Sequence, residues 1–594
     1  MKKITFKFVA LLIAGTVITL SCGKGFLEQT PKGALDENTL ANKKGVEALL
    51  IGAYSVLDGF IDGGGIFLGG WTSAGSNWVY GGVSGGDAHK GTDGGDQPDI
   101  NPIERFEHTP TNGYFNDKWS VVYEGVARSN SVLKVMAKAT DISAADVTRI
   151  TAEARFLRGH YHFEAKKMFN KVPYVDETVI DFKVPNDADI WPKIEADLKF
   201  AYDNLPETMN AKGRVNKWAA GALLAKAYLY QKKFTEAKTI FDLIYTTGKN
   251  AQGQKFALLP KYHQPFDAAT ENSTESVFAV QYSVNDGAPD AANGGWGEVL
   301  NFPYNSGPGG CCGFYQPSQD LVNAFQVNAV TGLPDPDNYN ATEVKNDQGI
   351  ASTDLFTPST ATLDPRLDWT VGRRGIPYLD HGVHPGADWI RLQSYGGPYS
   401  PVKNVFTKVE KDALNDKSFW TSGVTATNYT LIRFADVILM LAECEVEVGS
   451  LDKARQYVNE IRARASNPAG FVASASGPFA PYAANYKIGL YPVASPAFLT
   501  QAAARKSVHF ERRIELGMEG HRFFDLVRWG EAKATLDAYF LYVSGTSNPA
   551  INNKRLYLAT PTVAKFTVGK NEYFPIPQRQ IDLATGTLKQ NPGY

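Results

Sequence analysis

The sequence predicts a mainly α-helical protein with a scaffold of TPR-like helix–turn–helix units and a large, irregular subregion rich in loops. Apolar residues recur at helical spacing in paired segments before and after the middle of the chain. Two of these pairs carry small residues where neighbouring helices must approach closely, as TPR-like units require. Between them, residues 248–428 are rich in Gly, Pro, Asn and aromatic residues, a composition that favours loops.

Residues 1–21 are typical of a secretory signal. Basic residues precede an apolar stretch that is too short to cross a bilayer. Small residues then lead into Cys22, although Leu20 stands two residues before the cysteine, whereas the usual lipobox has its leucine three before. We expect Cys22 to be lipidated, with ordinary cleavage as the alternative, and residues 22–36 to form the anchor and tether. Acyl chains would hold the protein at a membrane with about 0.8 kcal/mol per buried methylene.

The first part of the scaffold is predicted at residues 37–247. Periodic apolar residues predict helices at 37–57, 115–139, 144–169, 190–204, 217–231 and 234–245. The glycine-rich stretch 62–96 interrupts this pattern and is expected to be loop, because its composition cannot hold a helix.

The clearest TPR-like unit is 217–230 followed by 233–238, where an aromatic residue opens the second helix. A second copy is 435–448 followed by 450–457, in which Gly449 ends one helix and Ser450 caps the next. It belongs to a second scaffold part at 429–530, followed by a C-terminal segment at 531–594. The insertion 248–428, with a strand-like run at 276–282, is too long for a loop. We expect it to pack on the scaffold within a single domain at 37–594.

Composition excludes several classes of protein. The net charge of −2 and the lack of a basic cluster argue against nucleic-acid binding. No run of roughly 18 apolar residues is available to span a membrane. Cys444 lies in an apolar helical stretch and is expected to be a buried thiol. Cys311 and Cys312 are expected to be two loop thiols, because a disulfide between neighbouring residues closes a strained ring.

Short motifs spread in order along the chain resemble those of the SusD/RagB family over essentially its full length. They lie at residues 26–31, 152–158, 169–173, 364–367, 431–436, 442–443, 458–464, 510–516, 519–526, 574–577 and 590–594. The resemblance implies a SusD-like fold with a ligand face built from loops, partnership with a SusC-like TonB-dependent transporter, and no catalysis. It also implies a lipid-anchored protein of the outer membrane that faces the cell exterior.

Three glutamates on one helical face would suit paired catalytic carboxylates, or ion pairs that tie helices together. These are Glu511, Glu515 and Glu519, with Arg512, Arg513 and Arg522 close in sequence. Because the arginines are placed to neutralise the carboxylates, we expect ion-paired structure and not catalysis.

Other motifs are weaker. Residues 82–86 match the G-x-S-x-G pattern around Ser84, but a serine hydrolase needs a strand before the serine and a helix after it. His381, His384 and Asp388 have metal-ligand spacing in a Gly/Pro loop that does not fix a third ligand. No cofactor is expected, although a structural calcium ion held by acidic residues remains open. These residues are Asp87, Asp93, Asp96 and Asp99.

Aromatic residues in loops predict a sugar-binding face. A flat ring can cover the apolar C–H face of a sugar while nearby polar groups bond its hydroxyls. From the place of the family's ligand site in loops, we expect Trp78, Trp296 and Tyr304 first, and then Trp71, Tyr80, Tyr315, Trp389 and Tyr395. The polar candidates are Asn77, Asp87, Asn301 and Arg391. For each residue, local packing of the loop is the alternative.

The sequence therefore predicts that the protein captures a glycan and delivers it to the transporter. About 2 kcal/mol for each aromatic platform predicts weak binding, on the order of micromolar to millimolar. The alternatives are capture of a peptide, an anchored glycoside hydrolase, and a scaffold lipoprotein that binds no ligand.

Overall fold

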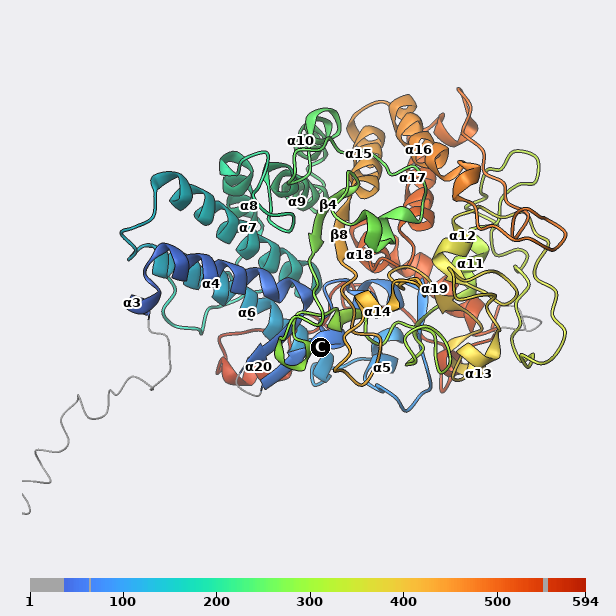
Figure 1. The fold of residues 1–594 in the computed structure, drawn as a ribbon, viewed down its shortest axis with the longest axis horizontal. Coiled ribbons are helices and arrows are strands. Elements are labelled where there is room, and N and C mark those ends of the chain that lie inside the picture. The colour runs from blue at the N-terminus through green and yellow to red at the C-terminus, as the bar shows by residue number, and fades with distance from the viewer. Residues whose placement is uncertain (1–36, 64–65, 548–553) are drawn as a thin grey trace, which may run out of the picture.

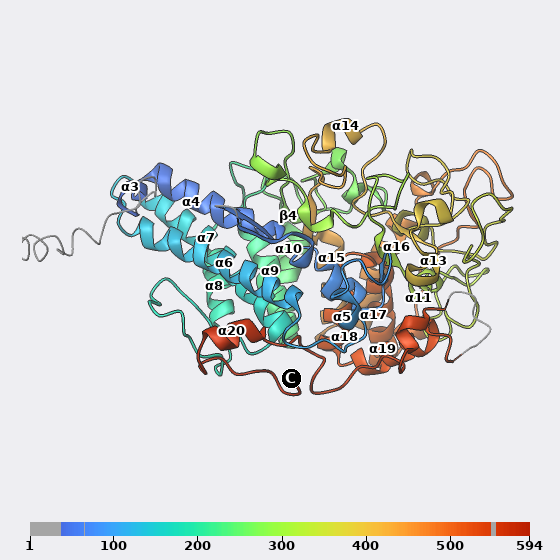
Figure 2. The same cartoon turned by 90° about the horizontal axis from the view of Figure 1, so that it is seen from below.

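The computed structural model describes residues 37–63, 66–547 and 554–594. Helices stack along one side of the molecule, and the loops of the insertion cover the other side (Figures 1 and 2). This arrangement confirms the predicted mainly helical fold. Cys22 and the signal-like segment lie outside the described residues, so lipidation stays a prediction.

The first helical layer follows the order of the chain. Each helix from α4 to α10 packs against its neighbours, apart from the five-residue α5 (Ile100–Glu104). The bounds are α3 Glu37–Leu40, α4 Lys43–Ser55, α6 Gly113–Met136, α7 Ala144–Phe169, α8 Trp191–Asn204, α9 Lys217–Tyr230 and α10 Phe234–Thr247.

The second helical layer continues the first across the insertion, because α15 packs against α10. Its bounds are α15 Phe434–Val448, α16 Leu451–Ala465, α17 Gln501–Leu516, α18 Arg522–Trp529 and α19 Ala532–Val543. The Ser450 side chain accepts a hydrogen bond from the Lys453 N–H, as predicted for the cap of α16.

Small residues let the helices of the scaffold approach closely. Helix α9 is buried on nearly every side, with alanine or glycine at six of its eleven buried positions. A Cβ atom added to Gly221 would lie 2.9 Å from the Tyr202 ring of α8, so glycine sets the spacing of this pair.

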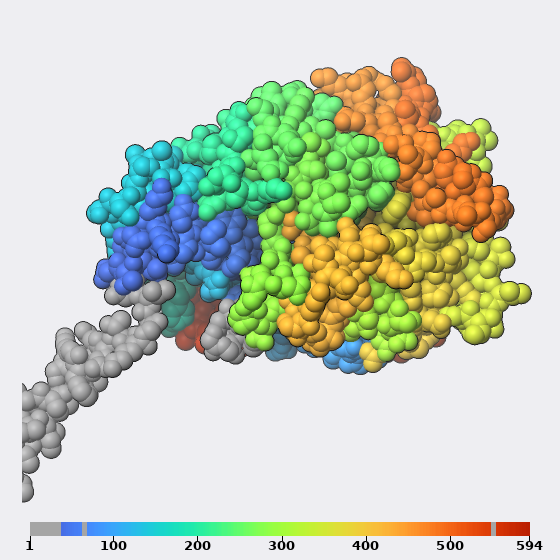
Figure 3. All heavy atoms as spheres, in the orientation of Figure 1, coloured from blue at the N-terminus to red at the C-terminus, as the bar shows by residue number. Residues whose placement is uncertain are grey.

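The insertion is tied to the scaffold at both of its ends. Strand β4 (Ser276–Val280), near its start, pairs antiparallel with β8 (Tyr429–Arg433), just after its end. The rest is mostly loop with short elements, and in Figure 3 its green, yellow and light orange segments cover much of the visible face. These elements are β5 Phe314–Pro317, α11 Gln319–Ala324, α12 Leu367–Thr370, β6 Val371–Gly372, α13 Gln393–Gly396, β7 Ser400–Pro401 and α14 Lys411–Leu414.

The glycine-rich stretch holds more structure than predicted. Strands β1 (Phe60–Gly63) and β2 (Ile66–Gly69) pair, β3 (Ala88–Gly91) pairs with β5, and Trp78–Val83 forms a buried π-helical turn. The expectation of loop throughout 62–96 was therefore wrong. A Cβ atom at Gly81 would lie 1.7 Å from the Gly520 carbonyl oxygen, so this glycine serves close packing and not flexibility.

A network of buried charges joins the insertion to the helices. Glu515 of α17 lies 2.7 Å from the Arg433 guanidinium and 3.0 Å from that of Arg366, and it also pairs with Arg464. Burial alone would raise the pKa of Glu515, but these three cations lower it overall. The prediction of ion-paired structure is therefore confirmed.

The predicted partners of these glutamates were wrong. Arg512 pairs with Asp436 and Asp525, and Arg513 pairs with Asp320. Residues one position apart on a helix point in different directions, so the neighbouring arginines cannot reach the same side as Glu511 and Glu515. Arginines that lie far away in the sequence pair with the glutamates.

The cysteines give one correct and one wrong prediction. Cys444 is a buried thiol, as expected. Cys311 and Cys312 form a disulfide with their Cα atoms 3.1 Å apart, so the prediction of two loop thiols was wrong. Gly309, Gly310 and Gly313 beside them have positive φ angles, which lets the backbone turn sharply around the pair.

The C-terminal segment returns to the first helical layer. Asn591 donates hydrogen bonds to the carbonyl oxygens of Phe169 and Phe574, and α20 (Gln578–Leu583) packs against α6 (Figures 1 and 2). Across the part of the chain that the structure describes, no helix combines the length and apolarity needed to cross a membrane.

Candidate functional site

A row of aromatic side chains reaches the surface where the N-terminal loops meet the insertion. We call Trp71, Trp296, Phe419 and Trp420 the aromatic ladder. Ring centroids lie 6.5 Å apart between Trp71 and Trp296, 4.5 Å between Trp296 and Phe419, and 5.6 Å between Phe419 and Trp420. The ladder runs from Trp296, which is buried, to Trp420, which is 61% exposed.

The inner part of the ladder is held firmly. Phe60 stacks on the Trp296 ring at 4.9 Å, and the Trp296 indole N–H donates to the Ala291 carbonyl oxygen at 3.1 Å. The half-buried Trp71 donates its indole N–H to Gln97 at 3.3 Å. Fixed rings lose little side-chain entropy when a ligand covers them, which favours binding.

A second group of surface residues surrounds Arg391. Its guanidinium forms ion pairs with Asp93 and Asp96 at 2.7 Å each, donates to the Thr92 hydroxyl, and lies 5.8 Å from the Tyr304 ring centroid. We call Arg391, Asp93, Asp96, Thr92 and Tyr304 the Arg391 cluster. Burial would raise the pKa of Asp93, but the N–H groups of residues 95 and 96, followed by Arg391, lower it overall.

The ladder and the Arg391 cluster share one short segment, residues 92–97. Asp96 pairs with Arg391 while its neighbour Gln97 accepts from Trp71. On the other side, the Thr421 hydroxyl next to Trp420 donates to the Gly309 carbonyl oxygen of the loop that carries Tyr304. Both groups therefore belong to one surface built from loops.

This surface combines two kinds of contact. The ladder offers apolar ring faces, and Arg391, Asp93 and Asp96 of the cluster offer donors and acceptors that remain partly exposed, whereas Thr92 is buried. Neutral ligands with apolar faces and hydroxyl edges, such as sugars, match this combination.

Some of the predicted site residues lie on this surface. Trp71, Trp296, Tyr304 and Arg391 belong to the ladder or the cluster. Tyr395 lies near them, because its ring stacks on Tyr557 at 4.3 Å and lies 5.3 Å from the Lys90 ammonium, whose backbone precedes the cluster. Tyr395 is partly exposed.

Trp296, at the inner end of the ladder, is itself buried, and so are the remaining predicted site residues. They are Trp78, Tyr80, Tyr315, Trp389, Asn77, Asp87 and Asn301. Trp78 is 1% exposed and donates to the Gly297 carbonyl oxygen at 3.1 Å, and the Tyr80 hydroxyl donates to the Thr72 carbonyl oxygen. These two rings offer no face to a ligand here, and they fix the loops beneath the ladder.

The sequence reasoning missed Phe419 and Trp420. Both lie near the end of the insertion, in a polar stretch that has no glycine next to the two rings. The aromatic residues predicted for the site were those of glycine-rich loops, so these two rings fell outside the prediction. Two adjacent aromatics in a polar stretch, with no helical or strand periodicity, were the signal that could have found them.

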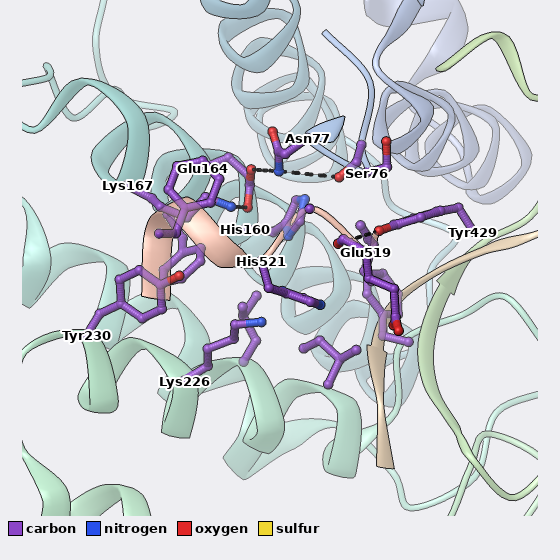
Figure 4. A pocket seen from close by; sticks show the side chains of 18 residues that line it. Ser76, Asn77, His160, Glu164, Lys167, Lys226, Tyr230, Tyr429, Glu519 and His521 are labelled. Atoms are coloured by element: carbon purple, nitrogen blue, oxygen red, sulfur yellow. Dashed lines mark hydrogen bonds and ion pairs between the residues drawn. The ribbon is translucent and has the colours of Figure 1, made fainter. Parts of the chain in front are cut away.

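A small enclosed cavity lies among buried charges beneath the loops (Figure 4). Glu164 accepts hydrogen bonds from Lys167 at 2.6 Å and from the Asn77 amide at 3.0 Å. Burial lowers the pKa of His160 to about 4, so this histidine is neutral at pH 7. The volume of ≈40 Å³ has room for about three water molecules and none for a sugar ring. The contact with Glu164 holds Asn77 in place, and the cavity is too small to be a ligand site.

The weaker motifs contribute to loop structure. Ser84 is buried, and its hydroxyl contacts the Val79 carbonyl oxygen. His384 lies 2.9 Å from the Ser400 hydroxyl, and His381 lies 3.0 Å from the Phe406 carbonyl oxygen. Within the described residues, no group of three or more His, Cys, Asp or Glu side chains is placed to hold a metal ion. Of the acidic residues suggested for calcium, Asp87 faces Arg513 at 3.6 Å, whereas Asp93 and Asp96 both pair with Arg391.

Family models and curated relatives both match this chain to SusD-like proteins. A model of the SusD family matches residues 274–594, and a model described as "Starch-binding associating with outer membrane" matches residues 99–229. Two curated relatives come from Formosa agariphila. SusD-like protein P25 is 24% identical, with 70% of each chain covered, and SusD-like protein P2 is 23% identical, with 83% of each chain covered.

Solved structures are similar in fold. One described as "Laminarin binding SusD-like protein" has a TM-score of 0.63 and 22% identity, and the match covers 93% of this chain and 100% of that one. Surface glycan-binding protein A from Bacteroides thetaiotaomicron, in complex with laminarihexaose, has a TM-score of 0.61 and 19% identity. That match covers 93% of this chain and 99% of the other.

Proposed function

The chain belongs to the SusD family, and from this premise we propose that it captures an oligosaccharide at the cell surface and passes it to a SusC-like TonB-dependent transporter. In this proposal the protein is a binding protein and not an enzyme. Cys22 anchors it by acyl chains to the outer membrane, with the loops facing the exterior.

The observation that carries the sugar proposal is the aromatic ladder beside the Arg391 cluster. Trp420 and Trp71 keep exposed surface on which a sugar ring can stack. Arg391 pairs with Asp96, whose neighbour Gln97 accepts from Trp71, and this places both polar groups beside the ladder to bond the hydroxyls of the sugar. The names of two similar structures, which mention laminarin and laminarihexaose, favour a β-glucan as the first ligand to test.

The proposal of binding without catalysis is supported by the state of the strongest candidate carboxylates. Glu511, Glu515 and Glu519 are buried and paired with arginines, so they cannot act on a ligand at the surface. Glycoside hydrolysis needs two carboxyl groups on either side of the bond that is cut. A direct test is to incubate the purified protein with laminarihexaose and to look for shorter products, of which we expect none.

The test of ligand capture is calorimetry of residues 23–594 against oligosaccharides of different linkage, including laminarihexaose. We expect a dissociation constant on the order of micromolar to millimolar for at least one of them. If none of the oligosaccharides binds measurably, sugar capture is contradicted, and a scaffold protein or a peptide-binding protein is favoured. For the transporter, we expect the lipidated protein to co-purify with a SusC-like protein from its own outer membrane, and purification without one would contradict that partnership.

A further inference from the structure

A second pocket lies elsewhere in the insertion, and it shares no lining residue with the aromatic ladder or the Arg391 cluster. Its cavity volume is ≈250 Å³, which suits a small ligand and not a long glycan. The lining comes from residues 263–268, Trp369, residues 379–380, residues 402–414 and Thr427.

The floor of this pocket is apolar and well fixed. Its apolar side chains are Phe266, Trp369, Leu379, Val402, Val405, Phe406 and Leu414. His263 stacks on the Trp369 ring with centroids 4.1 Å apart, and the Trp369 indole N–H donates to the Gly470 carbonyl oxygen at 2.7 Å. Because the ring is held on one face and at its edge, it forms a rigid wall for an apolar group.

The charged lining of the pocket is mainly acidic. Asp267, Asp380 and Glu410 line it, and Lys403 is the only lysine or arginine among the lining residues described. The Lys403 ammonium is buried and already bound to Glu519 at 2.6 Å. Asp380 is oriented by backbone N–H groups, including that of Val409 at 3.1 Å.

Burial and two acidic residues of the pocket raise the pKa of a neighbouring carboxyl group, that of Glu271. Glu271 has its pKa raised to about 7, first by burial and also by the negative charges of Glu410 and Asp267. The share of this rise that comes from Glu410 and Asp267 is electrostatic, and the same two negative charges attract a cation.

One buried polar atom in the lining has no partner in the protein. Thr427 is 7% exposed, and its hydroxyl makes no hydrogen bond within the described structure. Buried hydroxyls are normally bonded, so a polar group of a ligand or a water molecule is expected beside it. This observation is independent of the acidic residues.

We propose that this pocket binds a small organic cation, a primary ammonium group on an aliphatic or aromatic stem. The stem lies against Trp369 and Phe406, and the ammonium faces the carboxylates at the rim. A neutral sugar would leave the apolar floor poorly matched, and an anion would meet three like charges. The pocket is thus a second ligand site of different chemistry from the ladder.

The test compares three probes that share one stem and differ in charge. Hexylammonium, hexanol and hexanoate are titrated into the full mature protein at low salt and followed by saturation-transfer NMR. We expect hexylammonium to bind at least about fivefold more tightly than hexanol, and hexanoate to bind weakest, because the carboxylates attract only the cation. Equal or tighter binding of hexanoate overturns the proposal, as does the lack of hexylammonium binding at about 10 mM.

A double variant and a control variant test whether the preference for hexylammonium arises in this pocket. Replacement of two of the three rim carboxylates by Asp267→Asn with Glu410→Gln should lower the affinity for hexylammonium toward that for hexanol, while the affinity for hexanol is unchanged. The control is Asp337→Asn, which removes one carboxylate charge at an exposed site paired with Lys506 and should leave the binding of all three probes unaffected. If the double variant, in protein with an unchanged melting temperature, prefers hexylammonium over hexanol as strongly as the unchanged protein does, the assignment to this pocket is overturned.

Discussion

The exposed end of the aromatic ladder provides the sharpest test of sugar binding. The Trp420→Ala substitution removes a ring that is 61% exposed. With about 250 Å² for a whole tryptophan, roughly 150 Å² is accessible, and one sugar would cover about half of it. At about 25 cal/mol per Å² this contact contributes about 2 kcal/mol, which corresponds to roughly 30-fold in the dissociation constant.

The assay is calorimetry with the oligosaccharide that binds best to the unchanged protein. Because Trp420 is largely exposed, we expect its removal to leave the melting temperature unchanged. The matched control is Phe182→Ala, since Phe182 is 74% exposed and lies in the connection between α7 and α8. If Trp420→Ala binds the ligand as tightly as the unchanged protein, or if Phe182→Ala weakens binding equally, the ladder is not the ligand site.

Three further predictions concern stability and anchoring. Glu515→Gln should lower the free energy of unfolding by about 3–5 kcal/mol in chemical denaturation, because it leaves buried guanidinium groups without full neutralisation; Asp337→Asn should cost under about 1 kcal/mol, and similar losses in both would contradict this. His162 accepts from the Val175 N–H, and burial lowers its pKa to about 4. Below about pH 6.5 the His162 side chain is protonated in the unfolded chain but stays neutral in the folded protein. The free energy of unfolding, fully present above pH 6.5, should therefore fall by about 2 kcal/mol for this group by pH 5. His162→Gln should remove this share of the slope, and an unchanged slope would refute the assignment. Cys22→Ser should move the protein from the membrane to the soluble fraction on cell fractionation, and continued membrane association would count against the lipid anchor.

The helical scaffold could be predicted from local pattern. Helix α7 runs from Ala144 to Phe169, the same bounds that apolar spacing predicts, and Ser450 caps α16 as expected. Periodicity and caps depend on residues within a turn or two, so the sequence carries the information directly. The partner of Glu515 could not be predicted in this way, because Arg433 lies 82 residues away.

The candidate site was harder to predict from the sequence, because the exposure of each aromatic ring depends on contacts with residues far away along the chain. Trp78 and Trp71 lie in the same glycine-rich stretch, yet Trp78 is buried against Gly297, 219 residues along the chain. Trp420 has no such distant cover and remains exposed. Composition indicated that loop aromatics would form the surface, but only the packing of the insertion on the N-terminal loops decides which rings remain accessible.

The return of the C-terminal segment to α6 and α7 has a consequence for the order of folding. A ribosome makes α6 and α7 early and the segment around Asn591 last, so the surface that this segment covers waits uncovered for most of synthesis. The first helical layer is complete only when the final residues arrive. Chains that end prematurely therefore keep part of that layer exposed, which distinguishes them from finished molecules for any chaperone or protease that recognises apolar surface.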